Sequence, residues 1–160
     1  SKSARKRQMH ALQSLGEQLV KLSAAQLAKL NIDNEALIEA VQLAQRISHR
    51  SGKRRQMQFI GKLMRSADVE QIAGALGALH ETSRKAKAQE RVIEGARDAL
   101  LARGDEALPE VLAIWPHGDR QLIRQLTRSA HEERQRDQAP TSSRKLFRYL
   151  RSLSEASAED

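Results

Sequence analysis

The stretch from Asp68 to Gly104 contains no proline and keeps a helical spacing of apolar residues along most of its length. Apolar side chains recur every three or four residues, which is the period of a helix with one buried face. Asp68 is a suitable N-cap, with Gln71 at the capping-box position, and Gly104 is a suitable C-terminal stop. The sequence therefore predicts one helix over about residues 68–103, which is longer than a compact domain usually holds.

The middle of this predicted helix, HETSRKAKAQER from His80 to Arg91, is polar on nearly all sides. A helix that is apolar at both ends and polar between them is suited to joining two separate cores. We therefore expect an all-α fold, with two small helical bundles joined by the long helix into an elongated, dumbbell-like shape. We place the boundary near Lys85, so that residues 1–85 form the N-terminal bundle and residues 86–160 the C-terminal one.

The other segments also show helical spacing, and none alternates with the period of a strand. A basic first helix should be followed by a short one ending near Asn31. Between the last two helices, HEERQRDQAP at 131–140 is expected to be a solvated linker. The residues expected to cap or open the remaining helices are Asp33, Asp105, Asp119 and either Ser142 or Ser143.

Apolar residues on the two sides of Gly52 do not share a helical face. On a helical wheel, those of 37–44 lie nearly opposite those of 57–64. One straight helix cannot bury both sets against the same neighbour, and glycine weakens a helix interior by ~1 kcal/mol relative to alanine. We therefore expect the helix to break at Ser51–Gly52.

The densest basic cluster surrounds this expected break. No acidic residue occurs between His49 and Ser66, and four cations lie close together there, namely Arg50, Lys53, Arg54 and Arg55. A dense run of like charge repels itself unless an anion screens it, so the cluster predicts a docking surface for phosphate. The alternative is a solvated helix face without a partner.

The overall charge also favours a polyanionic partner. The chain carries 28 Lys and Arg against 20 Asp and Glu, a net charge of +8. Arg outnumbers Lys by 19 to 9, and the planar guanidinium binds phosphate through two hydrogen bonds. Aromatic residues are only 2% of the chain, which argues against single-strand binding by base stacking.

Two more basic faces are predicted in the second half. One helix carries Arg120, Arg124 and Arg128 at four-residue spacing. The last helix exposes a second set, namely Arg144, Lys145, Arg148 and Arg151. The alternative is that carboxylates of neighbouring helices neutralise these faces. If they remain free, these faces, the first cluster and Lys62 are the candidate RNA contacts.

Nothing in the sequence points to catalysis or to a bound cofactor. There is no cysteine, and the five histidines do not share a metal-ligand spacing. No glycine-rich phosphate loop or activated nucleophile stands out, so we expect no enzyme, metal, cofactor or small-molecule substrate. No apolar stretch is long enough to span a bilayer, and SKSARKRQ lacks the apolar core of a secretory signal. We expect a cytoplasmic protein with no membrane partner.

Several stretches together resemble a known family. They are LAQRISHRSGKRRQMQFIGKLMR (43–65), GDEALPEVLAIWP (104–116), DRQLIRQL (119–126) and RKLFRYLRSL (144–153). These stretches are similar to the DarP family of bacterial ribosome-associated proteins, the dual-action ribosomal maturation proteins. The resemblance implies an all-helical, elongated protein that binds precursors of the large ribosomal subunit. It also implies help in maturing the peptidyl transferase region of 23S rRNA, without enzymatic activity.

Two functions of different kinds follow. The first is an assembly factor whose basic faces bind the rRNA backbone in large-subunit precursors. The second is an adaptor that binds a ribosomal protein through apolar helical grooves. A nuclease acting on rRNA is disfavoured because no metal or acid–base constellation is present.

Overall fold

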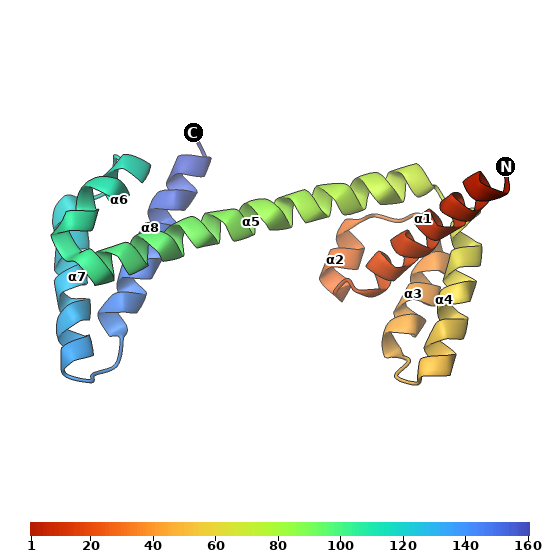
Figure 1. Ribbon diagram of the computed structural model, residues 1–160, viewed down its shortest axis with the longest axis horizontal. Coiled ribbons are helices and arrows are strands. Elements are labelled where there is room, and N and C mark those ends of the chain that lie inside the picture. Colours follow the sequence, from red (N-terminus) through yellow and green to blue (C-terminus); the bar gives the residue numbers. More distant parts are fainter. The chain divides into compact units, whose positions relative to one another are not determined.

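The computed structural model describes all 160 residues and is all-α, as expected (Figure 1). The chain forms eight α-helices and one short 3₁₀-helix, and no strand. The elements are α1 (Lys2–Val20), α2 (Ala24–Lys29), α3 (Glu35–Arg46), α4 (Arg50–Met64), α5 (Val69–Arg103), η1 (Gly104–Ala107), α6 (Leu108–Ile114), α7 (Arg120–Gln135) and α8 (Thr141–Ala158).

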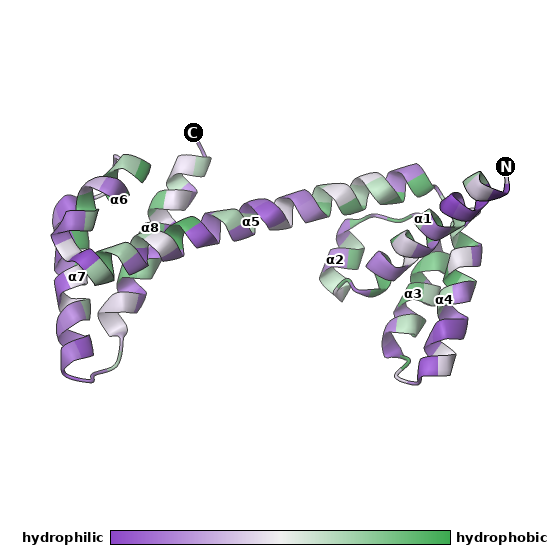
Figure 2. Ribbon diagram, viewed as in Figure 1, coloured by the Kyte–Doolittle hydropathy of each residue, from purple (hydrophilic) through white to green (hydrophobic).

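The long helix predicted over 68–103 is confirmed as α5, which has 35 residues. Its first turn is capped by Asp68, whose Oδ1 accepts a hydrogen bond from the backbone N–H of Gln71 at 3.2 Å. It ends at Arg103 and is followed by Gly104, which adopts a φ of 59° that L side chains rarely take. Figure 2 shows hydrophilic residues around the middle of α5 and hydrophobic ones toward its ends.

The expected capping box at this start is only half formed. The Gln71 side chain does not return to the Asp68 backbone, because its Nε2 donates to the carbonyl oxygen of Leu30 at 2.9 Å. Gln71 thereby satisfies a carbonyl at the end of α2 and ties this turn of α5 to the first helices. A tertiary contact replaces the local one.

The chain divides into two compact units, Ser1–Ser83 and Arg84–Asp160. In the first unit, α1, α3 and α4 pack on one another, and α2 and the first part of α5 complete the core. Fully buried aliphatic side chains fill it, including Leu19, Leu37, Ile60, Met64 and Ile72. The division into two domains with separate roles stays a prediction.

The helix does break near the basic cluster, but earlier than the Ser51–Gly52 position we expected. α3 ends at Arg46, and both Ile47 and His49 have extended backbones, with ψ of 120° and 129°. Gly52 lies inside the first turns of α4, where a Cβ would meet Cγ2 of Ile47 at 3.4 Å. That distance is an ordinary van der Waals contact, so the two extended residues make the turn and the glycine does not.

The N-cap of α3 is Asn34 and not Asp33. The Asn34 side chain accepts a hydrogen bond from the backbone N–H of Leu37 at 3.1 Å. Both residue types make good caps, so the local sequence could not separate them. Ile32, immediately before them, is buried in the core.

The second unit is built from the last part of α5, η1, α6, α7 and α8. Its core holds the only tryptophan, Trp115, together with aliphatic residues such as Ile93, Leu146 and Leu150. Asp119 caps α7 as predicted, since its Oδ1 accepts from the Leu122 N–H at 3.1 Å. Asp105, which was expected to open the next helix, lies in η1, and α6 begins only at Leu108.

The prediction of a linker over residues 131–140 is wrong for residues 131–135, because α7 continues to Gln135. The prediction that Ser142 or Ser143 caps the last helix is also wrong, since α8 begins at Thr141 and Pro140 precedes it. Instead, Glu133 of α7 accepts hydrogen bonds from the Ser142 backbone N–H at 2.9 Å and from its Oγ at 2.7 Å. A carboxylate on the neighbouring helix therefore caps α8.

Candidate nucleic-acid interface

The first two turns of α4 carry the basic cluster predicted from the sequence. Arg50, Lys53, Arg54 and Arg55 are all exposed. The first turn of α4 contains no acidic residue, and its N-cap residue His49 makes no capping hydrogen bond with its side chain. The partial positive charge at the helix N-terminus and the charges of the cations therefore lie at the same place on the surface. Together they favour an anion there.

Buried contacts hold this part of α4 in place. Ile60 and Met64 on its inner face are fully buried in the core. At the level of the basic cluster, Gln56 donates from Nε2 to the Ala40 carbonyl oxygen of α3 at 3.0 Å. In α3, Gln45 donates to the Val20 and Leu22 carbonyl oxygens at 3.2 and 2.8 Å. The cations therefore extend from a helix fixed against its neighbours.

The four cations of the cluster have no carboxylate partner within ion-pair distance. A shallow depression of about 470 Å³ lies over them, lined by His49, Arg50, Ser51, Arg54, Arg55 and Gln58. Lys53 does not line it. Because no intramolecular anion neutralises the cluster, its positive charge is available to a ligand.

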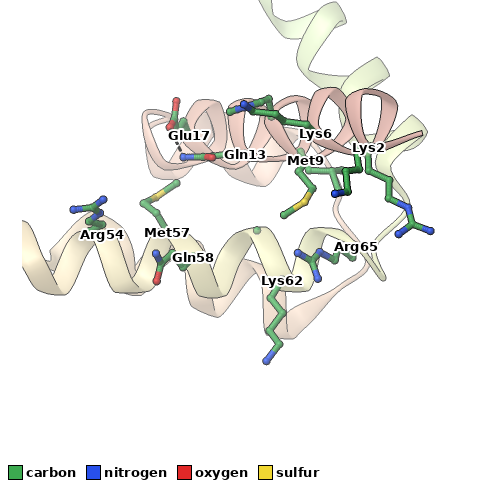
Figure 3. Close-up of a pocket in the computed structure, with 14 residues that line it drawn as sticks. Lys2, Lys6, Met9, Gln13, Glu17, Arg54, Met57, Gln58, Lys62 and Arg65 are labelled. Carbon is green, nitrogen blue, oxygen red and sulfur yellow. Dashed lines mark hydrogen bonds between the residues drawn. The ribbon is translucent and has the colours of Figure 1, made fainter.

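A larger groove of about 870 Å³ runs between α1 and α4 (Figure 3). Figure 3 shows the two helices side by side in opposite directions, with the thioethers of Met9 and Met57 pointing into the space between them. Six cations line the groove against a single acid, Glu17. The six are Lys2, Arg5, Lys6, Arg54, Lys62 and Arg65.

This groove was not predicted as a site, although two of its cations were. Arg54 and Lys62 were expected RNA contacts, and Figure 3 shows Lys62 extending on the side of α4 away from α1. The cations of α1 lie more than 40 residues earlier in the chain. The basic start of the sequence was the available signal, but only tertiary packing places it beside α4.

In the second unit, the α7 stripe is interrupted. Arg120 and Arg128 are exposed, whereas Arg124 pairs with Asp105 of η1, with Nε and Oδ1 3.3 Å apart. Nε of Arg124 is also enclosed and lacks a well-oriented hydrogen bond. Neutralisation by a neighbouring carboxylate, the alternative considered above, therefore applies to Arg124 alone in this stripe.

Most cations of the α8 face also lack an ion-pair partner. Arg144, Lys145 and Arg148 are exposed without an ion-pair partner. Arg151 instead binds Glu90 of α5, with its Nη2 2.8 Å from Oε1, and lies over the Phe147 ring at 5.0 Å from the ring centroid. Of the twelve predicted contact residues, ten therefore form no ion pair, and Arg124 and Arg151 do. Lys145 lies near Glu133, and its charge helps to lower the pKa of that carboxyl.

Comparison with known proteins shows what the chain is related to. Residues 1–151 match the family described as "Dual-action ribosomal maturation protein DarP". The chain belongs to the DarP family. A DarP protein of Idiomarina loihiensis is 47% identical over 154 residues, which are 96% of this chain and 90% of that protein.

Two other DarP proteins are similar over the same extent. That of Edwardsiella ictaluri is 46% identical over 98% of this chain and 84% of its own length. That of Pectobacterium carotovorum subsp. carotovorum is 43% identical over 97% of this chain and 84% of its own length. The match to DarP therefore includes both units and all the basic faces described above.

The structure lacks two further features. None of its helices has the length and apolar character needed to cross a membrane. No group of three or more His, Cys, Asp or Glu side chains is arranged to hold a metal ion.

Proposed function

We propose that this chain is a non-enzymatic ribosome assembly factor of the cytoplasm. In this proposal it binds precursors of the large ribosomal subunit through backbone contacts to 23S rRNA and promotes maturation of the peptidyl transferase region. Membership of the DarP family supports a role on the ribosome, because its relatives are named ribosomal maturation proteins. The large-subunit target is inferred from the family resemblance.

The observation that supports RNA binding most directly is the unneutralised charge of α4. Arg50, Lys53, Arg54 and Arg55 are exposed, have no carboxylate partner, and extend from a helix fixed by buried contacts. Double-stranded RNA is recognised mainly by its shape and its phosphates, which matches a basic surface with few aromatic residues. We infer that this cluster is the main contact.

The free cations of the second unit supply a second contact, namely Arg120, Arg128, Arg144, Lys145 and Arg148. When two contacts are linked in one chain, the second forms at the effective concentration set by the linkage. Two basic surfaces would therefore bind an assembling subunit more tightly than either surface alone.

Sucrose-gradient fractionation with tagged protein tests the proposal. We expect the wild type to co-sediment with large-subunit precursors, and Arg50→Glu/Arg55→Glu to lose most of this association. The matched control is Lys21→Glu/Lys29→Glu, which changes the net charge equally at exposed sites of the same unit. Association should weaken steeply as salt rises, since each phosphate contact releases counterions. Unchanged co-sedimentation of the α4 variant would rule out this surface.

The adaptor function remains the second candidate, because two large apolar side chains outside the groove between α1 and α4 are exposed in the first unit. Leu43 of α3 is 43% exposed and Phe59 of α4 is 49% exposed. An adaptor would keep its ribosomal protein after RNA is digested, whereas the proposed RNA contact would be lost. Ribonuclease treatment of the isolated complex therefore separates the two functions.

A further inference from the structure

We propose that the groove between α1 and α4 binds a single strand of RNA, at a site beside the α4 cluster that would contact folded rRNA and sharing Arg54 with it. This inference rests on the proposed function, because it assigns a second kind of RNA contact to the same unit. It is supported by the positive charge of the groove, by its apolar floor and by the close packing of α1 and α4.

The charge of the groove comes from both walls. α1 contributes Lys2, Arg5 and Lys6, and α4 contributes Arg54 and Arg65, whereas Lys62, also on the lining, extends away from α1. None of these six has a carboxylate partner, and the one acid on the lining, Glu17, is contacted by Gln13 at 3.5 Å. Cations along both sides of a channel are suited to one anionic chain lying between them.

The floor of the groove is apolar but not aromatic. Met9 is 54% exposed, while Leu12 and Met57 are half-buried. Met9 and Met57 are two of the three methionines of the chain, and the third, Met64, is fully buried in the core. Flexible thioethers adapt to irregular apolar surfaces, such as the face of a base or the edge of a ribose.

This floor is too small for an amphipathic helix. An amphipathic helix binds in a groove with a continuous apolar surface, which contacts apolar side chains of the helix at every third or fourth position. Met9 is the only large apolar residue on the lining that is exposed. The charge and the floor therefore favour a nucleic acid strand over an acidic peptide.

The close spacing of the two helices that form the walls favours a single strand over a duplex. Packed helices lie about 8–10 Å apart, which is narrower than double-stranded RNA. α1 and α4 meet closely where Gly16 packs against Ile60, and α1 is exposed along its whole beginning, residues 1–11. From Lys2 to Gln13 the α1 wall is about 16 Å long, which provides room for a few nucleotides.

Fluorescence anisotropy with two labelled probes tests this proposal. One probe is single-stranded oligouridylate of about 12 nucleotides, and the other is an RNA duplex of about 16 base pairs. The groove variant is Arg5→Glu/Arg65→Glu, and the matched control is Arg7→Glu/Lys21→Glu, whose residues are exposed but do not line the groove. Circular dichroism confirms that each variant folds.

The groove variant should bind the single strand about tenfold or more weakly than the control does, with little difference between them on the duplex. Its salt dependence should also fall by about 1.4 in log–log slope, because two phosphate contacts to a single strand are lost. Met9→Ala should weaken single-strand binding about threefold without changing that slope, since an apolar contact releases no counterions. Equal single-strand affinities of groove variant and control would overturn the proposal.

Two other outcomes are also decisive. If an acidic amphipathic peptide displaces the oligouridylate at a lower concentration than unlabelled oligouridylate does, the groove is a protein site and the proposal fails. If Arg50→Glu/Arg55→Glu abolishes subunit association while the groove variant alone loses the single strand, both proposals are supported. Loss of the main function would instead appear as wild-type protein that does not co-sediment with subunit precursors.

Discussion

Gly16 of α1 packs so closely on Ile60 of α4 that a Cβ added to the glycine would lie 3.0 Å from Ile60 Cγ2. Ile60 is fully buried and β-branched, so its methyl group cannot easily move aside. The contact sets how near α1 comes to α4, and with it one end of the basic groove. Glycine is needed here for the space it leaves and not for its backbone freedom.

Gly16→Ala is therefore expected to destabilise the first unit. The gain of ~1 kcal/mol in helix propensity should be outweighed by ~1–3 kcal/mol of overpacking, for a net loss of about 1 kcal/mol. The control is Gly74→Ala, where a Cβ meets nothing within 4 Å and stability should rise by up to ~1 kcal/mol. Denaturant unfolding followed by circular dichroism measures both. Similar stabilisation by the two substitutions would contradict the packing argument.

The contact between Glu133 and Ser142 predicts a pH dependence in the second unit. Hydrogen bonds from the Ser142 hydroxyl, and then from its backbone N–H, hold the pKa of Glu133 below its usual value. A lowered folded-state pKa means that the stabilisation is present above the unfolded pKa, about 4.5, and is lost as pH falls through the folded value. The unfolding free energy should therefore decrease on acidification below about pH 5.

Glu133→Gln should remove part of this acid-dependent loss, because the amide does not titrate. Glu132→Gln is the matched control, since Glu132 is exposed and its side chain has no hydrogen-bond partner. Unfolding curves of Trp115 fluorescence at a series of pH values provide the measurement. An unchanged pH profile in the Glu133 variant would show that the cap does not contribute.

Arg148 and Arg151 of α8 were both predicted to contact RNA, but their substitution should affect stability and RNA binding differently. Arg151 binds Glu90 and stacks over Phe147, so Arg151→Ala should lower the stability of the second unit by about 1 kcal/mol. Arg148 is exposed and unpaired, so Arg148→Ala should leave stability unchanged and weaken RNA binding. Thermal unfolding and RNA binding, measured on both variants, check the prediction. Equal effects of both on RNA binding would show that the Arg151 ion pair opens readily.

The two units should unfold separately if the proposed division into domains holds. Trp115 is buried in the second unit, and the first unit contains no tryptophan. Leu37→Ala in the first core should cost about 2–5 kcal/mol, which lowers the circular dichroism transition of that unit. The Trp115 fluorescence transition should stay where it is. A parallel shift of both signals would mean that α5 makes the two units one cooperative body.

The all-α class, the length of α5 and the α7 cap at Asp119 could be read from the sequence, because each depends on local periodicity and local hydrogen bonding. Two of the errors occurred where a partner distant in sequence competes with a local one. Gln71 turns to Leu30 and leaves the capping box, and Glu133 takes the capping role expected of Ser142. These partners could not be predicted from local sequence patterns, because such patterns describe only residues that are close together in the chain.

The same distinction applies to the candidate site. The sequence by itself determined that a basic, aromatic-poor, helical chain carries cations in clusters, since charge and helical spacing are properties of the chain. Only the tertiary structure decided which of the twelve predicted contact residues are ion-paired: Arg124 and Arg151 bind carboxylates of other elements, and the other ten form no ion pair. It also brought the basic start of α1 beside α4, because burial of Leu19 and Ile60 in one core requires the two helices to pack together.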